Sequence, residues 1–320
     1  MKTILPLLLL CLLAAPPLRA DEAPGWTLLL TEAEWSADDI IRVPFTLTGT
    51  LITVRARVDT TEGNFFFDTG ASGLLLNSRY FQDQAEGPGH SSAGGVTGRV
   101  RVLGAIQVDT FGLDNLVAAD IRAELLDLSH IENAKKVDLM GIIGFEVFQD
   151  YEVLFDYAAF RLVLIRINKK GVPLTPLPEW EYQLRESFPI SVAGHVAVVN
   201  IRFPRTPALR FALDSGAEQN MIDNRAGDRF LKENFEIGKR IKLRGAGKKS
   251  IEVLSGKLLN VRLDSLSFRP MATLLANLNE INKTYETEVD GILGYEFLSQ
   301  YPVSVNYKKR RLTFYRSVRP

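Results

Sequence analysis

Cysteine and histidine are scarce in this sequence of 320 residues. The one cysteine, Cys11, lies in an apolar run near the N-terminus, so no internal disulfide can form. The three histidines stand singly, and no HExxH, CxxC or acidic calcium-loop spacing occurs. They are His90, His130 and His195, and we interpret them as surface or packed side chains. We therefore expect no metal site, no cofactor, and stability that comes from core packing.

Charge of one sign is not in excess either. The sequence has 38 Lys and Arg residues and 38 Asp and Glu residues, a formal net charge of zero with neutral histidine. Such a balance gives no indication of a nucleic-acid partner. The local basic cluster at 308–311 lies between two short strand-like stretches, and we interpret it as a solvated hairpin turn.

A hydrophobic run long enough for a membrane anchor is lacking at the N-terminus. The apolar run there, residues 4–15, has 12 residues, whereas a membrane-spanning helix needs about 20. It follows a charged start and precedes a Pro-Pro break and the small Ala20. This pattern predicts a secretory signal peptide over residues 1–20, and a mature protein without a membrane span, in the periplasm or secreted. Lipid modification at Cys11 is an alternative, which the bulky Leu10 disfavours.

What the sequence does have is an internal repeat. The stretch FFFDTGAS, with Asp68, has a counterpart in FALDSGAE, with Asp214, 146 residues later. The stretch GIIGFEVFQDYEVLFDY, from Gly141, matches GILGYEFLSQYPVSVNY, from Gly291, without gaps at a shift of 150 residues. The stretches VPFTLTGTLITVRA and FPISVAGHVAVVNI also correspond, at a shift of about 145 residues. We therefore interpret the chain as a tandem duplication.

Both halves show the alternation of apolar and polar residues that is typical of half-buried strands. We expect helix only in short pieces, such as EYQLRESF at 181–188 and the residues after each second glycine motif. The prediction is a mainly β protein with few short helices. Three prolines at 173–178 favour an extended connection. A Pro-rich linker at 167–186 would thus separate an N-terminal half, 41–166, from a C-terminal half, 187–320.

The two repeated Asp residues indicate acid–base chemistry if the halves pack face to face. Two carboxyls a few ångströms apart cannot both ionise cheaply, so they hold one proton between them. The ionised member can take a proton from water while the protonated member hydrogen-bonds an amide carbonyl, without a cofactor. Gly70 and Gly216 would allow close backbone approach and strained dihedrals. The hydroxyls of Thr69 and Ser215 would tie the two turns together.

The two D-[TS]-G-A motifs and the later IIG and ILG motifs resemble those of the pepsin-like and retropepsin-like aspartic proteases. The distance from Asp68 to Gly144 is 76 residues, that from Asp214 to Gly294 is 80, and the resemblance covers roughly 41–316. It implies two homologous acid-protease-type β-barrel lobes related by a pseudo-twofold axis, with each acid-bearing turn braced by the later glycine motif. It also implies a catalytic dyad, Asp68 and Asp214. The supporting active-site turns would comprise Thr69, Gly70, Ala71, Ser215, Gly216 and Ala217.

The resemblance further implies a flap that closes over bound peptide. The stretch 86–98 is rich in glycine, which lowers the cost of moving between conformations. It contains no tyrosine and looks more like the flap of the retropepsin group. The candidate flap residues are Gly89, Gly94 and Gly95 in the first half, and Gly245 and Gly247 in the second. A plain mobile loop is the alternative.

Two departures from the pepsin pattern bear on pH and regulation. Ala71 and Ala217 follow the motif glycines, where many pepsin-like enzymes carry a hydroxyl that can hydrogen-bond the carboxyl. Loss of that donor lets the pKa values of the pair rise, so we expect activity to extend towards weakly acidic or neutral pH. The N-terminal acidic segment, residues 21–40, has no basic residue and cannot neutralise two carboxylates. We therefore do not expect a pepsin-type zymogen.

Three functions fit the sequence. The first is an aspartic endopeptidase that works as a bilobal monomer, because both acids lie on one chain, and binds an extended peptide or protein substrate as an added strand. The second is a catalytically inactive peptide-binding module on the same fold. The third is a structural or envelope-associated interaction protein in which the two acids merely end strands. That third function leaves the matched hydroxyls at Thr69 and Ser215 unexplained.

Overall fold

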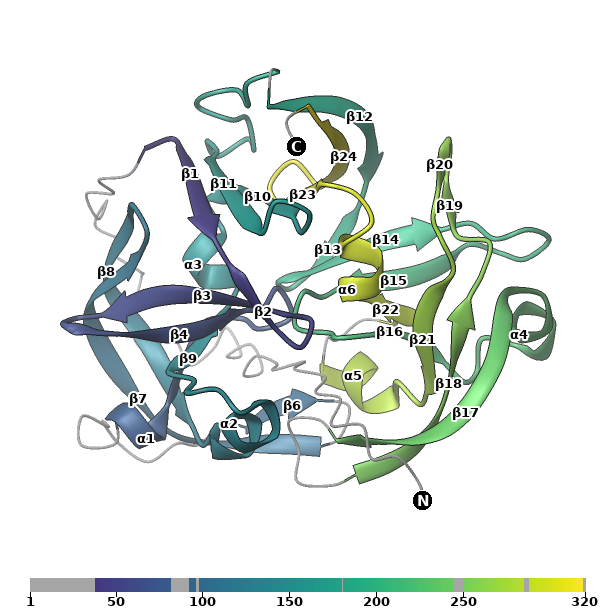
Figure 1. Ribbon diagram of the computed structural model, residues 1–320, viewed down its shortest axis with the longest axis horizontal. Coiled ribbons are helices and arrows are strands. Elements are labelled where there is room, and N and C mark those ends of the chain that lie inside the picture. The colour runs from purple at the N-terminus through teal and green to yellow at the C-terminus, as the bar shows by residue number, and fades with distance from the viewer. Residues whose placement is uncertain are drawn as a thin grey trace, which may run out of the picture.

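The computed structural model describes residues 38–81, 92–95, 98–179, 181–244, 250–284 and 288–318. In these ranges the chain is mainly β, with 24 strands and six short helices (Figure 1). The strands form two eight-stranded sheets, one six-stranded sheet and a two-stranded hairpin. The prediction of a mainly β protein with few short helices is confirmed.

The first eight-stranded sheet comes from the first half of the chain. Its strands lie in the order β2 (Thr46–Thr48), β3 (Leu51–Val58), β4 (Thr61–Phe67), β9 (Gly141–Ile143), β5 (Leu74–Asn77), β8 (Leu116–Leu126), β7 (Gly98–Leu113) and β6 (Ser92–Gly95). The pairs β4 with β9 and β5 with β8 are parallel. The run of three phenylalanines in β4 is buried on both faces, because Phe65 and Phe67 pack in one cluster and Phe66 in another.

The second eight-stranded sheet repeats this order with the second half of the chain. Its strands are β13 (Ser191–Ala193), β14 (Val196–Ile201), β15 (Leu209–Leu213), β22 (Gly291–Leu293), β16 (Asn220–Asp223), β21 (Met271–Ala276), β18 (Ser250–Leu258) and β17 (Phe235–Arg244). The parallel pairs, β15 with β22 and β16 with β21, occupy the same places as in the first sheet. The repeat in the sequence is therefore also a repeat in strand order and direction.

The six-stranded sheet contains strands from both halves and lies between and above the other two sheets in Figure 1. Its order is β1 (Ile40–Pro44), β11 (Arg161–Arg166), β10 (Tyr151–Asp156), β23 (Val303–Asn306), β24 (Arg311–Ser317) and β12 (Tyr182–Pro189). At its centre, β10 pairs with β23 as Val153 with Val305, Leu154 with Ser304, and Phe155 with Val303. Because the repeat shift is 150 residues in this stretch, exchanging the two halves leaves the register unchanged.

The helices of the described ranges are short. They are α1 (Ser78–Phe81), α2 (Ser129–Lys135), α3 (Phe145–Phe148), α4 (Asp228–Asn234), α5 (Asn279–Thr284) and α6 (Tyr295–Leu298). The helices α3 and α6 follow the two later glycine motifs, as predicted. Within the described part of the chain, no helix has the length and apolar character needed to cross a membrane. The remaining hairpin joins β19 (Arg262–Leu263) and β20 (Leu266–Ser267).

The prediction of helix at 181–188 is wrong. This stretch lies almost entirely in β12, which pairs antiparallel with β24 across an irregularity between Leu184 and Glu186. The irregularity breaks the strict alternation of a strand, which explains why the sequence pattern looked helical. Backbone pairing with β24 overrides the weak local preference for helix.

The connection between the two halves packs against the six-stranded sheet. The buried carboxylate of Glu181 pairs with the guanidinium groups of Arg42 in β1 and Arg161 in β11. The predicted linker, residues 167–186, overlaps the first five residues of β12. The connection is therefore anchored at its end by two ion pairs and by strand pairing.

Candidate active site

The two acid-bearing turns follow equivalent strands. The strands β4 and β15 end one residue before Asp68 and Asp214, and each pairs in parallel with the strand of a later glycine motif, β9 or β22. The amide of Asp68 donates to the carbonyl of Ile143 at 3.0 Å, and that of Asp214 donates to the carbonyl of Leu293 at 3.0 Å. These hydrogen bonds fix the backbone at the point where each carboxyl leaves it.

The turns approach so closely that only glycine fits at one position of each. A Cβ atom at Gly70 would lie 2.8 Å from a carboxyl oxygen of Asp214, and one at Gly216 would lie 2.4 Å from the carboxyl of Asp68. Each glycine is therefore pressed against the carboxyl of the other half, which places the two carboxyls side by side. Neither glycine has a positive φ angle. The expectation of strained dihedrals is thus wrong, and close approach explains why glycine is required.

Two hydroxyls connect the turns in a reciprocal pattern. The amide of Thr69 donates to Ser215 Oγ at 3.0 Å, and the amide of Ser215 donates to Thr69 Oγ1 at 3.0 Å. The hydroxyl of Thr69 donates to the carbonyl of Leu213 at 3.4 Å, and that of Ser215 donates to the carbonyl of Phe67 at 2.9 Å. Both side chains are buried, so an amide left without its partner would cost about 1–3 kcal/mol. The hydroxyls hold the two turns in a fixed relative position.

Both carboxyls are fully buried, with 0% of Asp68 and 0% of Asp214 exposed. Burial raises the pKa of Asp68 well above its ordinary value, and the charge and hydrogen bonding of Asp214 raise it further. The amides of Gly70 and Ala71 lower that pKa, but by less. The Gly70 amide donates to Asp68 Oδ1 at 2.8 Å, and the Gly216 amide donates to Asp214 Oδ1 at 2.8 Å. The pair therefore retains a proton at a pH where an isolated Asp has released it.

Two equivalent tyrosines, Tyr157 and Tyr307, lie close enough to the carboxyls to respond to their charge. Burial raises the pKa of each phenol above its ordinary value, and the charge of Asp214 adds to the rise in both. Both phenols therefore stay protonated through the neutral range. They therefore add no charge near the carboxyl pair.

The alanines that follow the motif glycines are also fully buried. The carbonyl of Ala71 accepts a hydrogen bond from the amide of Phe145 at 2.9 Å, and that of Ala217 accepts one from the amide of Tyr295 at 3.0 Å. Phe145 and Tyr295 are the first residues of α3 and α6. Each acid-bearing turn is thus attached to the helix that follows its later glycine motif.

The predicted flap lies largely outside the described residues. The candidates in the undescribed part are Gly89, Gly245 and Gly247. Gly94 and Gly95 end β6, where they pair with Arg99 and Gly98 at the start of β7. This hairpin has the same place in its sheet as β17 and β18 have in the second sheet. The role of these glycines as a flap stays a prediction.

Sequence reasoning missed two features beside the turns. In the tip of the β13–β14 hairpin, the Nε2 atom of His195 lies 3.0 Å from the carbonyl oxygen of Gly70. On the other side, Lys135 of α2 forms an ion pair with Glu218, and these side chains are only 7% and 6% exposed. The repeat aligns His195 with Thr50 in the tip of the β2–β3 hairpin. This alignment could have indicated that the two hairpin tips have equivalent positions. No sequence signal pairs Lys135 with Glu218.

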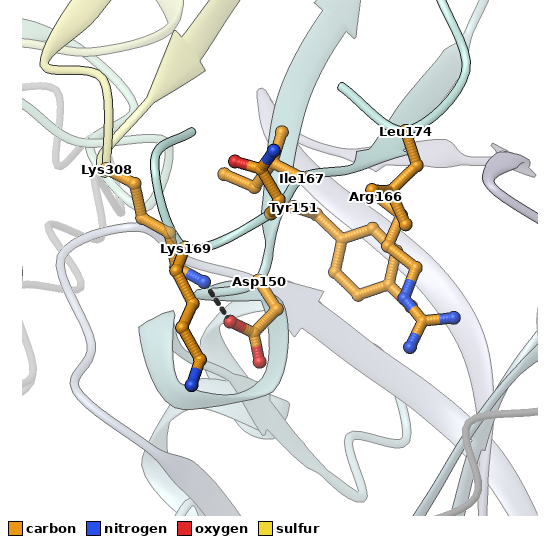
Figure 2. Close-up of a pocket in the computed structure, with 8 residues that line it drawn as sticks. Asp150, Tyr151, Arg166, Ile167, Lys169, Leu174 and Lys308 are labelled. Atoms are coloured by element: carbon orange, nitrogen blue, oxygen red, sulfur yellow. Dashed lines mark hydrogen bonds and ion pairs between the residues drawn. The ribbon is translucent and has the colours of Figure 1, made fainter. Parts of the chain in front are cut away.

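A separate cavity of about 320 Å³ lies beside the start of β10, the end of β11 and the β23–β24 turn (Figure 2). Its charged lining residues are Asp150, Arg166, Lys169 and Lys308. The dashed line in Figure 2 joins Lys308 and Asp150, which form an ion pair. Neither acid-bearing turn contributes to this lining, so the cavity is distinct from the carboxyl pair. The basic cluster at 308–311 spans the turn into β24, as predicted.

Built from its residues, the site is a buried pair of carboxyls that two equivalent turns supply and two hydroxyls hold in place. Such a pair can act as a base through one member and as an acid through the other. No protein-family model and no curated protein matches the chain.

Proposed function

We propose that this chain is an aspartic endopeptidase that hydrolyses peptide bonds in extended peptides or proteins. The observation that carries the proposal is the pair of carboxyls, Asp68 and Asp214, buried side by side on turns whose glycines leave no room for a Cβ atom. A merely structural role for the two acids does not require this arrangement. Two buried carboxyls that face each other are costly unless they share a proton.

In the proposed reaction the pair holds one proton. The ionised carboxyl takes a proton from a water molecule, whose oxygen attacks the carbonyl carbon of the peptide bond. The protonated carboxyl donates a hydrogen bond to the carbonyl oxygen while negative charge grows there. When the C–N bond breaks, the nitrogen takes from the pair the proton that water gave up, and the products are a carboxylic acid and an amine. The pair then again holds one proton.

We also infer that the two halves are acid-protease-type β-barrel lobes related by a pseudo-twofold axis. Three observations support this inference. The two eight-stranded sheets have the same strand order. The β10–β23 register is unchanged when the halves are exchanged. The reciprocal hydrogen bonds of Thr69 and Ser215 map onto each other at the repeat shift of 146 residues. One chain supplies both acids, so we propose a monomer, exported to the periplasm or secreted.

The proposed activity extends towards weakly acidic or neutral pH. The pKa of Asp68 is raised, so the pair keeps its shared proton to a higher pH than two isolated Asp residues would. The limb of the pH–rate profile on which that proton is lost therefore moves to higher pH. A profile confined below about pH 4, close to the value of an unperturbed Asp, would contradict this part of the proposal.

The proposal is tested by incubating the purified mature protein, residues 21–320, with a mixed peptide library between pH 3 and pH 8 and recording product masses. The same assay is run with Asp68→Asn and Asp214→Asn. A matched control is Asp120→Asn, because Asp120 is exposed, away from the turns, and has a positive φ angle that Asn also tolerates. Thermal unfolding of each variant establishes that it folds.

The expected result is cleavage by the wild type and by Asp120→Asn, and loss of cleavage in both dyad variants. A wild type that cuts no peptide but retains peptides on a column would overturn the protease proposal in favour of a peptide-binding module. Cleavage that persists in the folded Asp68→Asn or Asp214→Asn variant would also overturn it, because the mechanism requires both carboxyls.

A further inference from the structure

A histidine of the second half contacts the acid-bearing turn of the first. His195 follows Gly194 in the tip of the β13–β14 hairpin, and Gly194 has a φ angle of +57° that suits the turn. The imidazole is partly buried, its Nε2 atom is 3.0 Å from the carbonyl oxygen of Gly70, and its ring centroid is 6.4 Å from that of Phe145. The side chain is therefore held against the turn that carries Asp68.

The partner of this hydrogen bond fixes the tautomer. A backbone carbonyl can only accept, so Nε2 of His195 must carry a hydrogen and donate it to Gly70. The remaining ring nitrogen, Nδ1, is then the atom at which the imidazole gains or loses a proton. Protonation at Nδ1 does not break the contact with Gly70. It turns the contact into a charge-assisted hydrogen bond, which is shorter and stronger.

The peptide unit that accepts the hydrogen bond from His195 lies close to Asp68 in the same turn. The carbonyl that accepts from His195 belongs to the peptide unit whose N–H is that of Ala71. The Ala71 amide donates to the main-chain carbonyl of Asp68 at 3.3 Å, and the Gly70 amide donates to Asp68 Oδ1 at 2.8 Å. Both amides lower the pKa of Asp68. A hydrogen bond to the oxygen of a peptide unit polarises its N–H, so hydrogen bonds in such a chain strengthen one another. One peptide unit therefore lies between the imidazole and Asp68, whose ionised carboxyl the amides of this turn stabilise.

The position equivalent to His195 in the first half does not carry an imidazole. The residue equivalent to His195 is Thr50, whose hydroxyl donates to the carbonyl of Glu218 at 3.2 Å. A threonine hydroxyl does not ionise in the pH range of the assay. Its acceptor, Glu218, lies two residues beyond Gly216 in the sequence. Of these two hairpin contacts, only the contact of His195 with the turn of Asp68 involves a side chain that titrates.

We propose that His195 is a positioning residue that couples its own protonation to the charge of the Asp68–Asp214 pair through the carbonyl of Gly70. Its effect on cleavage rests on the proposed function, whereas the coupling itself does not. A positive imidazole favours the pair with one negative charge over the fully protonated pair. The acid limb of activity therefore extends to lower pH than it would without His195.

Among the described residues, three elements near the imidazole supply titratable groups. The acid-bearing turns supply Asp68 and Asp214, and α3 supplies Glu146, whose pKa burial raises. Tyr307, whose ring contacts Phe145, stays protonated. The hairpin that carries His195, residues 190–200, has no other ionisable side chain. Burial lowers the pKa of His195 and the contact with Gly70 opposes this, so the imidazole gains its charge at acidic pH.

The coupling is measured first by NMR, without use of activity. The titration of the His195 ring is followed in the wild type, in Asp68→Asn/Asp214→Asn and in Glu146→Gln, with His130 as an internal control and His195→Gln used to assign the signal. Removing the charge of the pair is expected to lower the pKa of His195 measurably, with a smaller effect in Glu146→Gln. A His195 titration that is the same in the wild type and in the folded double variant would overturn the proposal.

The consequence for cleavage is measured with His195→Leu and His195→Gln. Loss of the donor in the Leu variant is expected to lower kcat by roughly tenfold. Gln can place an N–H near the Nε2 position, so the Gln variant is expected to keep most of the wild-type kcat. The acid limb of kcat should nevertheless move to higher pH in the Gln variant, because Gln cannot gain a charge. An acid limb at the wild-type pH in the folded Gln variant would overturn the proposal. A wild type without activity leaves the NMR measurement as the deciding test and speaks only against the proposed function.

Discussion

The two halves of the molecule have the same structure around the two carboxyls, but they differ in the contacts that each half makes with the turn of the other. The strand order, the parallel pairs β4–β9 and β15–β22, and the reciprocal hydroxyl bonds are the same on both sides. The contacts around the turns are not. The tip of one hairpin presents Thr50 to Glu218, and the tip of the other presents His195 to Gly70.

A second asymmetry is the buried ion pair of Lys135 and Glu218. Glu218 lies two residues beyond Gly216. The equivalent position in the first half is Ser72, which cannot form such a pair. The difference teaches that the geometry of the carboxyls constrains both turns alike. The contacts between the halves differ from one turn to the other.

The largest expected effect comes from removing either carboxyl, which should show the equivalence of the two turns. In the proposed mechanism, Asp68→Asn and Asp214→Asn each leave a pair that can no longer exchange a proton with water and substrate. We expect kcat to fall by about a thousandfold in each, measured by product formation at the pH optimum. A loss confined to one of the two variants would break the comparison, because one carboxyl would then suffice.

The next largest effect concerns the asymmetric ion pair. Lys135→Met leaves the buried carboxylate of Glu218 without its cation, which should lower the free energy of unfolding by about 3–5 kcal/mol. Denaturant unfolding at pH 7 measures this. The matched control is Lys136→Met, because Lys136 is the exposed neighbour. Lys135→Met combined with Glu218→Leu should recover much of the loss. No recovery in the double variant would show that the ion pair does not account for the effect.

The motif glycines should show a smaller effect of unequal size. An added Cβ atom at Gly216 would come within 2.4 Å of the other carboxyl, and one at Gly70 within 2.8 Å. We expect Gly216→Ala and Gly70→Ala to lower the free energy of unfolding by about 1–3 kcal/mol, with the larger loss at Gly216, and to lower cleavage in both. Gly112→Ala is the control, because an added Cβ atom there would meet only ordinary contacts, the nearest at 3.7 Å, and Gly112 has no positive φ angle. Equal stability of all three alanine variants and the wild type would contradict the close approach.

The smallest expected effect comes from the hydroxyl ties. Thr69→Val and Ser215→Ala each remove the acceptor of one buried amide, and each should cost about 1–2 kcal/mol in unfolding free energy. Because the two hydroxyls belong to one reciprocal network, the double variant should deviate from the sum of the single effects. A double-mutant cycle measures that deviation, and strict additivity would contradict a shared network.

Much of the site could be predicted from the sequence because its parts lie within short motifs that occur twice. Asp68 and Asp214 could be matched by the repeat, and the hydroxyls of Thr69 and Ser215 follow directly after them. The helices α3 and α6 were predictable for the same reason. Local chemistry and duplication together were enough to indicate a symmetric pair.

What the sequence could not predict depends on packing between distant segments. The strand β12 exists because β24 lies beside it, and its irregularity at Leu184 hides the alternation of a strand. The contact of His195 with Gly70 spans 125 residues and arises only when the halves assemble. The prediction of strained dihedrals at the motif glycines is wrong. Glycine is required there because a Cβ atom would meet the carboxyl of the opposite half, and not because of the backbone conformation of the turn.

The measurement that tests most directly whether the two carboxyls form one proton-sharing pair is a double-mutant cycle on stability as a function of pH. Unfolding free energies are compared for the wild type, Asp68→Asn, Asp214→Asn and the double variant between about pH 4 and pH 8. The folded-state pKa of Asp68 is raised, so its contribution to stability is fully present below the unfolded pKa and is lost as pH rises through the folded pKa.

Asp68→Asn should therefore be more stable than the wild type at pH 7, and this advantage should shrink towards pH 4. The second substitution should add much less than the first, because the repulsion is already gone. Effects of Asp68→Asn and Asp214→Asn that are additive and independent of pH would contradict a shared proton.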